Sequence, residues 1–424
     1  MKKLFLALLC GTLWLAGCGQ MGLEGQVFAP TEAPSATPVV VTNTALPGPT
    51  AAPTEAPTEP PTQAANVLPA PLYFISTRNN QIWRIERDGA TATQVTREAF
   101  DIDSFDVSPV DGALVYVSNN TLIVSDANGG AREARINGLK VEATDYKAQW
   151  EQQIRNPRWR PDGQEIFFGQ GGLNVIVARG EDGPHNILPA SPYPDEAAGR
   201  PTNMPANYWP HSFSPNGSFL LAFKHYYPEG FSLVLVRLNS DAAPVELAND
   251  LGPNCCDISW SADSQTIYLG GEAAMTHGLD FVGLWKASVD DGKFQPLVRG
   301  YVGESDQPPA PGATFTRVSF PFEAGGQLYA FANIRPATDD EQMKPDTLGL
   351  ARVAPDGTVT LVSSEKFQTL EAIGAADGSG GALVDIAEWN YSGPYPLGRL
   401  RWVPSDGSPA VDLVEIGREI RWGK

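Results

Sequence analysis

Two heptapeptides decide the fold: Pro157-Arg158-Trp159-Arg160-Pro161-Asp162-Gly163 and His211-Ser212-Phe213-Ser214-Pro215-Asn216-Gly217. In each of them an aromatic residue stands two positions before a proline, and an Asp-Gly or Asn-Gly pair follows the proline. Such sequences form tight turns, because proline fixes φ and glycine accepts a positive φ. Looser copies occupy Phe105–Pro109 and Ile258–Asp263. A strand that ends in a tight turn is therefore repeated along the chain.

A second turn recurs after each of these units. Each of these turns follows a run of residues in which apolar and polar side chains alternate and in which β-branched or aromatic residues are frequent. A second run of the same kind lies upstream of the first. Such runs are typical of β-strands with one buried face. The seven turns are Asp88-Gly89, Asn128-Gly129, Asp182-Gly183, Ser240-Asp241, Asp291-Gly292, Asp356-Gly357 and Asp406-Gly407. The pattern predicts units of four strands and an all-β fold.

The first unit lacks its opening strand, and the end of the chain supplies a candidate for it. Glu419-Ile420-Arg421-Trp422-Gly423 matches Asp257–Ser261, which opens another unit. A C-terminal strand that completes the N-terminal sheet closes a β-propeller and hides its edges. We therefore predict a seven-bladed β-propeller over residues 71–424. Six blades are the alternative if one degenerate unit is a decorated loop.

The Trp/Phe-x-Pro-Asp-Gly turn with its downstream strands resembles the PD40 repeat, a WD40-like repeat of TolB-type β-propellers. The resemblance covers 71–424 and implies a propeller fold. TolB carries a small α/β domain ahead of its propeller, whereas a tether stands there in this chain. Dipeptidyl-peptidase relatives carry an α/β-hydrolase domain after theirs. Neither family's activity can therefore be transferred.

The N-terminal segment, residues 1–17, reads as a signal peptide. Lys2 and Lys3 precede an apolar stretch from Leu4 to Leu15, which is shorter than the roughly 20 residues that span a bilayer. The stretch ends in Leu15-Ala16-Gly17-Cys18, which resembles the lipobox of bacterial lipoproteins and implies that Cys18 is lipidated. An ordinary cleaved signal with a chance cysteine is the alternative. We expect a lipoprotein on the outer membrane or on the outer face of the cell membrane.

Residues 18–70 are predicted to be a disordered tether. The stretch repeats units such as Thr31-Glu32-Ala33-Pro34 and Thr54-Glu55-Ala56-Pro57, and it contains no Lys or Arg. With almost no aromatic side chains it cannot bury enough apolar surface to fold. We expect it to hold the folded body away from the lipid surface.

Charge excludes some partners. The formal net charge is −19, from 30 Lys+Arg against 49 Asp+Glu. Nucleic-acid binding is therefore not expected, because its affinity comes from cations that neutralise phosphates. Anionic membrane surfaces are disfavoured for the same reason, so we expect membrane contact through the lipid anchor only.

Long loops are expected on one side of the propeller, where the second-to-third hairpins and the inter-blade segments 137–155, 189–209 and 299–314 lie. Long loops on a rigid scaffold usually carry binding residues. The aromatic and histidine side chains of this face are the candidate ligand-binding residues, although several could simply pin loops onto the blades. The candidates are Trp150, Tyr208, Trp209, His211, Tyr226, Tyr227 and His277.

Two adjacent cysteines, Cys255 and Cys256, are the only thiols of the predicted propeller. Neighbouring Cα atoms lie about 3.8 Å apart, below the usual disulfide range of about 4.4–6.8 Å, so a bond between them would be strained. Both a vicinal disulfide and a reduced, packed pair stay open.

No catalytic motif, cofactor-binding motif or metal-ligand spacing stands out in the sequence. We therefore predict a monomeric, non-catalytic binding module for an envelope protein, a peptide or a glycan. The alternative is a propeller hydrolase or lyase that acts on saccharides, and buried carboxylates clustered at the central channel would favour it.

Overall fold

The structure is a computed structural model that describes residues 66–142, 144–180, 182–192, 206–226, 231–251, 257–271, 283–300, 314–336, 347–386 and 398–424. The chain divides into two compact units, Met1–Thr62 and Gln63–Lys424, and every described residue belongs to the second. The predicted signal peptide, Cys18 and nearly all of the tether lie outside the described residues. No helix in the described ranges combines the length and the apolar character needed to cross a bilayer.

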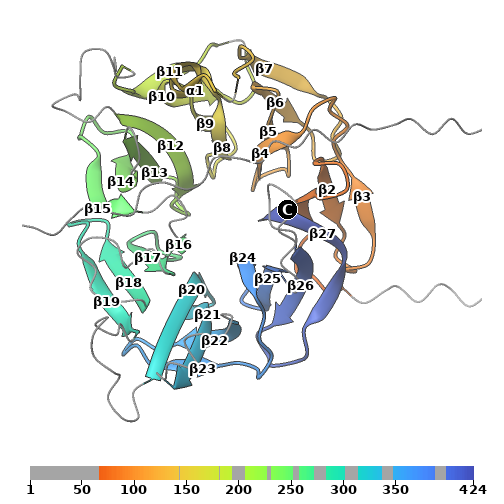
Figure 1. The fold of residues 1–424 in the computed structure, drawn as a ribbon, viewed down its shortest axis with the longest axis vertical. Coiled ribbons are helices and arrows are strands. Elements are labelled where there is room, and N and C mark those ends of the chain that lie inside the picture. Colours follow the sequence, from red (N-terminus) through yellow and green to blue (C-terminus); the bar gives the residue numbers. More distant parts are fainter. Residues whose placement is uncertain are drawn as a thin grey trace, which may run out of the picture. The chain divides into compact units, whose positions relative to one another are not determined.

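Five four-stranded antiparallel sheets follow one another along the chain (Figure 1). The first three are β4 (Ile102–Val107), β5 (Leu114–Ser118), β6 (Thr121–Ser125) and β7 (Glu133–Asn137); β8 (Arg155–Trp159), β9 (Glu165–Gly169), β10 (Gly172–Val177) and β11 (His185–Pro189); and β12 (Ala206–Phe213), β13 (Phe219–Tyr226), β14 (Phe231–Arg237) and β15 (Val245–Leu251). The other two are β16 (Asp257–Trp260), β17 (Thr266–Gly270), β18 (Gly283–Ser288) and β19 (Phe294–Arg299); and β20 (Thr314–Ala324), β21 (Gln327–Pro336), β22 (Gly349–Val353) and β23 (Val359–Leu361). The predicted all-β class and the four-stranded units are confirmed.

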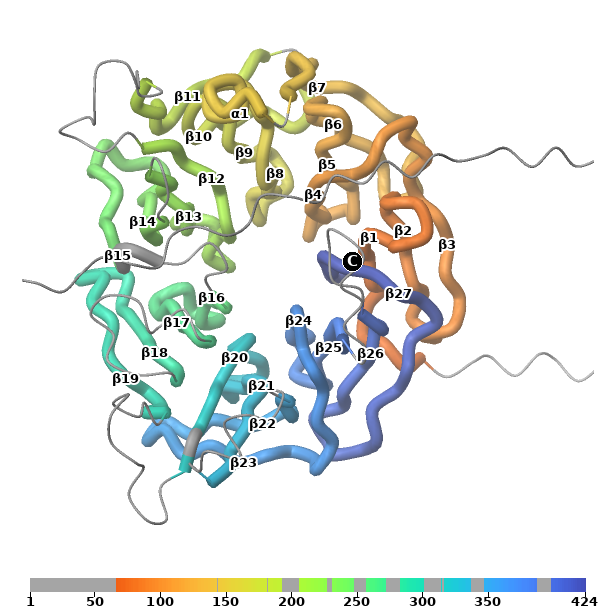
Figure 2. The backbone as a smooth tube through the Cα atoms, viewed as in Figure 1, coloured from red at the N-terminus to blue at the C-terminus, as the bar shows by residue number. Residues whose placement is uncertain are grey.

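A seven-stranded sheet contains both the first and the last strands. Its order is β24 (Thr369–Gly374), β25 (Gly380–Asp385), β26 (Gly398–Pro404), β27 (Val411–Trp422), β1 (Leu72–Ser76), β2 (Ile82–Ile85) and β3 (Ala92–Gln94). The first half of β27 pairs with β26, where Trp402 is opposite Val411, and its second half pairs with β1, where Leu72 is opposite Trp422. The sequence predicted an outer strand and a separate closing strand here, but Figure 2 shows one continuous strand.

The second strand of most sheets is buried on both faces, whereas the sequence pattern predicted one buried face. All five residues of β1 and of β5 are buried. Leu72 and Phe74 pack toward β24–β27, while Tyr73 and Ile75 pack toward β4 and β5. Because each sheet lies between two others, both of its faces are core.

Buried clusters join each sheet to the next along the chain. One cluster lies between β1–β3 and β4–β7, and further clusters follow at each later junction. A cluster that includes Phe74, Leu400 and Trp402 joins β24–β27 to β1–β3. Burial of apolar surface is the main stabilising term in folding, so these junctions hold the sheets together.

Glycines in the third-to-fourth turns allow neighbouring sheets to approach closely. Gly129 has φ +78° and Gly357 has φ +86°. A Cβ atom on Gly129 would overlap the carbonyl oxygen of Val95, and one on Gly357 would overlap that of Leu297. Each oxygen belongs to the preceding sheet or directly follows its last strand, so the turn residue must be glycine for both its backbone angle and its packing.

The link between β7 and β8 contains a helix that the sequence reading did not predict. α1 (Tyr146–Gln152) is capped by Asp145, whose side chain accepts a hydrogen bond from the amide of Ala148 at 2.9 Å. Trp150 is its buried residue. An N-cap followed by a buried aromatic residue is the signal that could have located this helix.

Candidate functional site

The strands nearest the centre of Figure 1 are β4, β8, β12, β16, β20, β24 and the C-terminal half of β27, and we call them the inner strands. Most of them contact the next inner strand along the chain, and β27 contacts β4. Their first residues lie at the end of the sheets that carries the second-to-third hairpins and the links between sheets, the connection end. The opposite end carries the tight turns and is called the turn end.

Six of the inner strands are interrupted by a β-bulge. The register shifts fall between Ile102 and Ser104, Arg155 and Arg158, Pro210 and Ser212, Ser319 and Phe322, Thr369 and Glu371, and in β27 opposite Tyr73 and Ile75. Bulges turn side chains away from the sheet's regular alternation, and they are over-represented next to active sites. Their repetition in the inner strands marks these strands as the candidate site.

Backbone strain accompanies three of these bulges. Asn156, Phe320 and Glu419 have φ values of +47°, +50° and +51°. Positive φ is unfavourable for residues other than glycine, especially for a bulky side chain such as that of Phe320. Strained residues cluster at functional sites because the surrounding structure must compensate for their cost.

Charged side chains and one indole gather at the starts of β4, β8, β12 and the second half of β27. The guanidinium carbon of Arg155 lies 4.7 Å from the centroid of the Trp209 ring. Arg418 forms an ion pair with Glu419 at 2.8 Å. We call Asp103, Arg155, Trp209, Arg418 and Glu419 the inner-start cluster.

Asp103 is the solvent-exposed carboxyl of this cluster. Crowding by the surrounding protein raises its pKa, and the negative charges of Asp101 and Glu419 act in the same direction. The positive charges of Arg418 and Arg155 partly offset this rise. Asp103 can therefore accept a hydrogen bond or take up a proton more readily than an isolated aspartate.

Three other carboxylates of the inner strands have structural partners. Asp106 accepts the amide of Trp159 at 2.8 Å, and Glu371 accepts the amide of Ile420 at 3.2 Å. Asp257 accepts the amide of Phe320 in the same manner. In each case a carboxylate on one inner strand holds the backbone of the next, and we call these contacts the carboxylate latches.

Burial affects the charge state of two latches. It raises the pKa of Glu371, which Arg421 partly offsets from 3.3 Å, and it raises the pKa of Asp257. These carboxylates already bond to backbone amides of a neighbouring inner strand. Their oxygens are therefore engaged in joining inner strands and are poorly placed to serve as free acid–base groups.

Two further ionisable groups lie among the latches. Arg158 donates to the carbonyl oxygens of His211 at 2.7 Å and of Pro157 at 2.9 Å, and burial lowers its pKa to about 10. Burial also lowers the pKa of His211 to about 3, and the charges of Arg158 and Arg421 contribute to that shift. His211, a candidate from the sequence, is therefore neutral at ordinary pH.

Two of the predicted aromatic residues meet around a third ring. The His225 ring centroid lies 5.3 Å from that of Trp150, 4.9 Å from that of Trp209 and 4.6 Å from that of Phe231. Trp150 is only 6% exposed and donates to the carbonyl oxygen of Ser191 at 2.9 Å. Trp150 therefore supports the links above the sheet, and Trp209 is the member that also touches Arg155.

Tyr208 and Tyr226 belong to a different group. Tyr208 is opposite Lys224 in the sheet, and Tyr226 donates to Glu246 at 3.0 Å. Lys224 forms an ion pair with Glu246 at 3.1 Å. The structure thus separates these tyrosines from Trp150 and Trp209.

The remaining predicted residues are Tyr227, His277, Cys255 and Cys256, and all four lie outside the described residues. Sequence reasoning missed Asp103, Arg155, Arg418 and Glu419. Asp103 and Arg155 are charged residues at or near the start of an inner strand, and Arg418 and Glu419 belong to the C-terminal half of β27. In the part of the chain that the structure describes, no group of three or more His, Cys, Asp and Glu side chains is placed to hold a metal ion.

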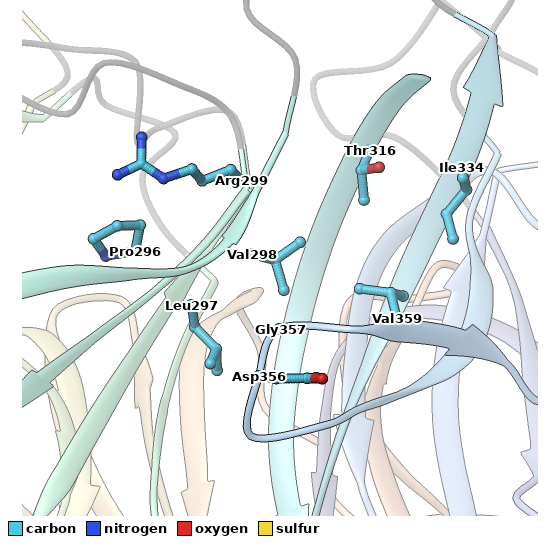
Figure 3. A pocket seen from close by; sticks show the side chains of 9 residues that line it. All are labelled: Pro296, Leu297, Val298, Arg299, Thr316, Ile334, Asp356, Gly357 and Val359. Atoms are coloured by element: carbon cyan, nitrogen blue, oxygen red, sulfur yellow. The ribbon is translucent and has the colours of Figure 1, made fainter. Parts of the chain in front are cut away.

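Two pockets lie between consecutive sheets, away from the inner-start cluster. One, of about 490 Å³, is bounded by β19 and by the β20–β23 sheet, and Figure 3 shows Leu297, Val298 and Val359 on its walls. The other, of about 440 Å³, lies between the β8–β11 and β12–β15 sheets. Both are grooves where two sheets meet, and neither gathers the charged side chains seen at the inner starts.

No family model and no curated protein matches this chain. Solved structures do match, and they include a putative TolB and a β-propeller domain. An oligogalacturonate lyase in complex with manganese has a TM-score of 0.50 at 9% identity, over 83% of this chain and 86% of that chain. The oligogalacturonate lyase of Vibrio parahaemolyticus has a TM-score of 0.50 at 10% identity, over 84% and 87%. A putative TolB from Agrobacterium tumefaciens has a TM-score of 0.37 at 12% identity, over 69% and 87%.

These similarities concern the fold alone, because every identity is far below 25%. They agree with the β-propeller character predicted from the sequence. The neighbours include oligogalacturonate lyases, but a shared fold does not by itself give this chain their activity.

Proposed function

We propose that this chain is a lipid-anchored, extracytoplasmic β-propeller of seven blades that binds a partner at its connection end without catalysing a reaction. The partner is an envelope protein, a peptide or a glycan. Cys18 would carry the lipid, and residues 18–70 would separate the folded body from the membrane.

The seven-bladed, closed arrangement is supported by the sheet order. Strand β27 serves as the outermost strand beside β26 and as the innermost strand beside β1, so the seven-stranded sheet amounts to two blades. Together with five four-stranded sheets, this arrangement gives seven. The buried cluster between β24–β27 and β1–β3 supports closure, since it joins the last blade to the first.

The binding proposal rests on a difference between two sets of charged residues, those that bond to backbone amides and those of the inner-start cluster. Asp106, Asp257 and Glu371 are bound to backbone amides of neighbouring inner strands, so these carboxylates have a structural role. The inner-start cluster instead offers an exposed carboxyl on Asp103 and a guanidinium on Arg155. Such mixed polar and aromatic groups on a rigid scaffold suit recognition of a ligand.

Binding can be tested with the purified protein on arrays of glycans and of synthetic peptides. Arg155→Gln removes the guanidinium over Trp209, and we expect at least a tenfold loss of affinity for any compound that the wild type retains. Arg352→Gln is the matched control, because Arg352 also lies over an aromatic ring, that of Tyr329 at 5.9 Å. Equal retention by wild type and Arg155→Gln would exclude this site.

Saccharide hydrolysis or lysis is the second candidate, and one observation favours it. Glu419 lies near enough to Asp103 for its charge to raise the pKa of Asp103, and paired carboxylates are the machinery of glycoside hydrolysis. The fold is also that of oligogalacturonate lyases. If a saccharide panel is turned over, and Asp103→Asn and Glu419→Gln each slow turnover by more than a hundredfold while binding persists, the enzyme reading replaces the binding module.

A further inference from the structure

Three apolar side chains at the connection end of the β4–β7 sheet are the most exposed large hydrophobic side chains in the described part of the chain. Leu139 is 69% exposed, Tyr146 is 66% exposed and Phe100 is 57% exposed. Phe100 lies in the link between β3 and β4, Leu139 in the link between β7 and α1, and Tyr146 is the first residue of α1. All three therefore stand on links that flank one hairpin, Ser118–Thr121.

Hydrogen bonds from that hairpin and its neighbour hold the backbone of these links. The carbonyl oxygen of Phe100 accepts bonds from Ser118 Oγ at 3.2 Å and from Gln81 Nε2 at 3.1 Å. Asn120 Nδ2 donates to the carbonyl oxygen of Leu139 at 2.7 Å and to that of Gln152, at the end of α1, at 3.1 Å. Asn120 Oδ1 also accepts the amide of Ile154 at 2.7 Å.

These bonds fix the main chain while the side chains of Phe100 and Leu139 remain in solvent. A surface that is ordered before binding loses less conformational entropy when a partner arrives. Exposed apolar side chains that gather in one place mark interaction sites, whereas isolated ones need no explanation. The arrangement is therefore that of a preformed contact surface.

Charge indicates what kind of partner fits. The surrounding links and inner starts carry the exposed carboxylates of Asp101, Asp103, Glu142, Asp145 and Glu151. They outnumber the exposed cations of the same segments, Arg97, Lys140 and Lys147. Complementary potentials steer association, so a partner with Lys or Arg is favoured. An anionic lipid surface would be repelled.

We propose that Phe100, Leu139 and Tyr146 form a docking surface for a protein segment that carries apolar side chains flanked by Lys or Arg. The inference rests on the proposed binding function and names the partner class for its connection end. Apolar side chains of the segment would cover Phe100 and Leu139, and its cations would meet the surrounding carboxylates.

The test uses the full-length protein and an array of twelve-residue peptides in which net charge and apolar content vary independently. We expect retention of peptides that are both cationic and apolar, with weaker retention at 0.5 M than at 0.05 M salt. Phe100→Ser combined with Leu139→Ser should lower their affinity at least tenfold. Val110→Ser is the matched control, because Val110 is 43% exposed at the turn end of the same sheet.

Equal thermal unfolding midpoints of the double variant and the wild type would show that lost retention comes from the surface itself. Retention that ignores peptide charge, or that survives in the double variant, overturns the docking surface.

The same array run with glycans, and with vesicles of neutral and of anionic lipids, separates the alternatives. Glycans retained in place of peptides, and lost in Arg155→Gln, would overturn this inference and leave the binding module standing. Vesicles retained through Phe100 and Leu139 would make the surface a membrane contact and overturn it as well. Saccharide turnover without any retention would overturn both proposals.

Discussion

The turn end and the connection end are formed by the same strands, yet their residues have different roles. At the turn end, Gly129 and Gly357 pack against backbone of the preceding sheet, with no room for a side chain. At the connection end, Phe100 and Leu139 project into solvent from links that buried side chains hold in place. The turn end therefore joins the sheets, and the connection end has side chains free for contact with other molecules.

Charged residues follow the same division within the inner strands. Glu371 and Asp106 bond to the next strand's backbone, whereas Asp103, nearer the connection end, remains exposed. Stability and recognition are thus separated by a few residues along one strand. If Glu371 stabilises the fold and Asp103 does not, substitutions of these two residues must differ in their effect on the free energy of unfolding.

The largest expected effect is at a turn glycine. Gly129→Ala should lower the free energy of unfolding by about 3–5 kcal/mol, because the new Cβ needs a strained φ and overlaps the carbonyl oxygen of Val95. Gly183→Ala, at the corresponding turn of the β8–β11 sheet, should change it by less than about 0.5 kcal/mol, since that Cβ would meet nothing within 4 Å. Urea unfolding of the two variants measures the difference, and equal losses would contradict the packing role of the turn.

A smaller loss is expected from removing a carboxylate latch. Glu371→Ala leaves the amide of Ile420 without this acceptor and Arg421 with one carboxylate fewer, so unfolding should become easier by about 2 kcal/mol. Asp103→Asn should alter the free energy of unfolding by less than about 0.5 kcal/mol. A loss in Asp103→Asn as large as that in Glu371→Ala would show that the two residues do not differ in this role.

A further expected effect is a change in how the free energy of unfolding depends on pH. The pKa of His211 is about 3 in the folded protein, against an ordinary value of 6.5. Between these two values the unfolded chain binds a proton that the folded protein does not, so stability should fall as the pH falls from 6.5 toward 3. His211→Gln should reduce this slope in urea midpoints measured at pH 7, 5 and 4. An unchanged slope would mean that His211 is not enclosed as described.

Much of the fold could be predicted, because turn chemistry is local. The Asp-Gly turns and the alternating runs between them predicted units of four strands, and the structure contains five separate four-stranded sheets. The single strand β27 was not predicted, since its two pairing partners lie far apart in the sequence. Nor was the burial of both faces of β1, which depends on the sheets on either side of it.

The candidate site was harder to predict because it depends on register. Trp209 was named from its residue type, but its contact with Arg155 depends on how β12 packs against β8. Trp150 was named for the same reason, and it is only 6% exposed because it is the buried residue of a helix that was not predicted from the sequence. Residue type thus suggests candidates, and bulges and links decide which of them reach solvent.

The double pairing of β27 also bears on how the chain reaches its folded state. Thr77 donates to the carbonyl oxygen of Ile416, 339 positions away, and Leu72 is opposite Trp422. Contacts between such distant residues form late and slow folding, because a long loop must be closed before they contribute any stability. The β1–β3 strands would therefore wait for residues 411–422 before their sheet is complete. During that wait the edge of β1 that later pairs with β27 is unpaired, and such an edge can pair with another chain. The same strand that completes the sheet thus sets the interval in which the protein is most exposed to aggregation.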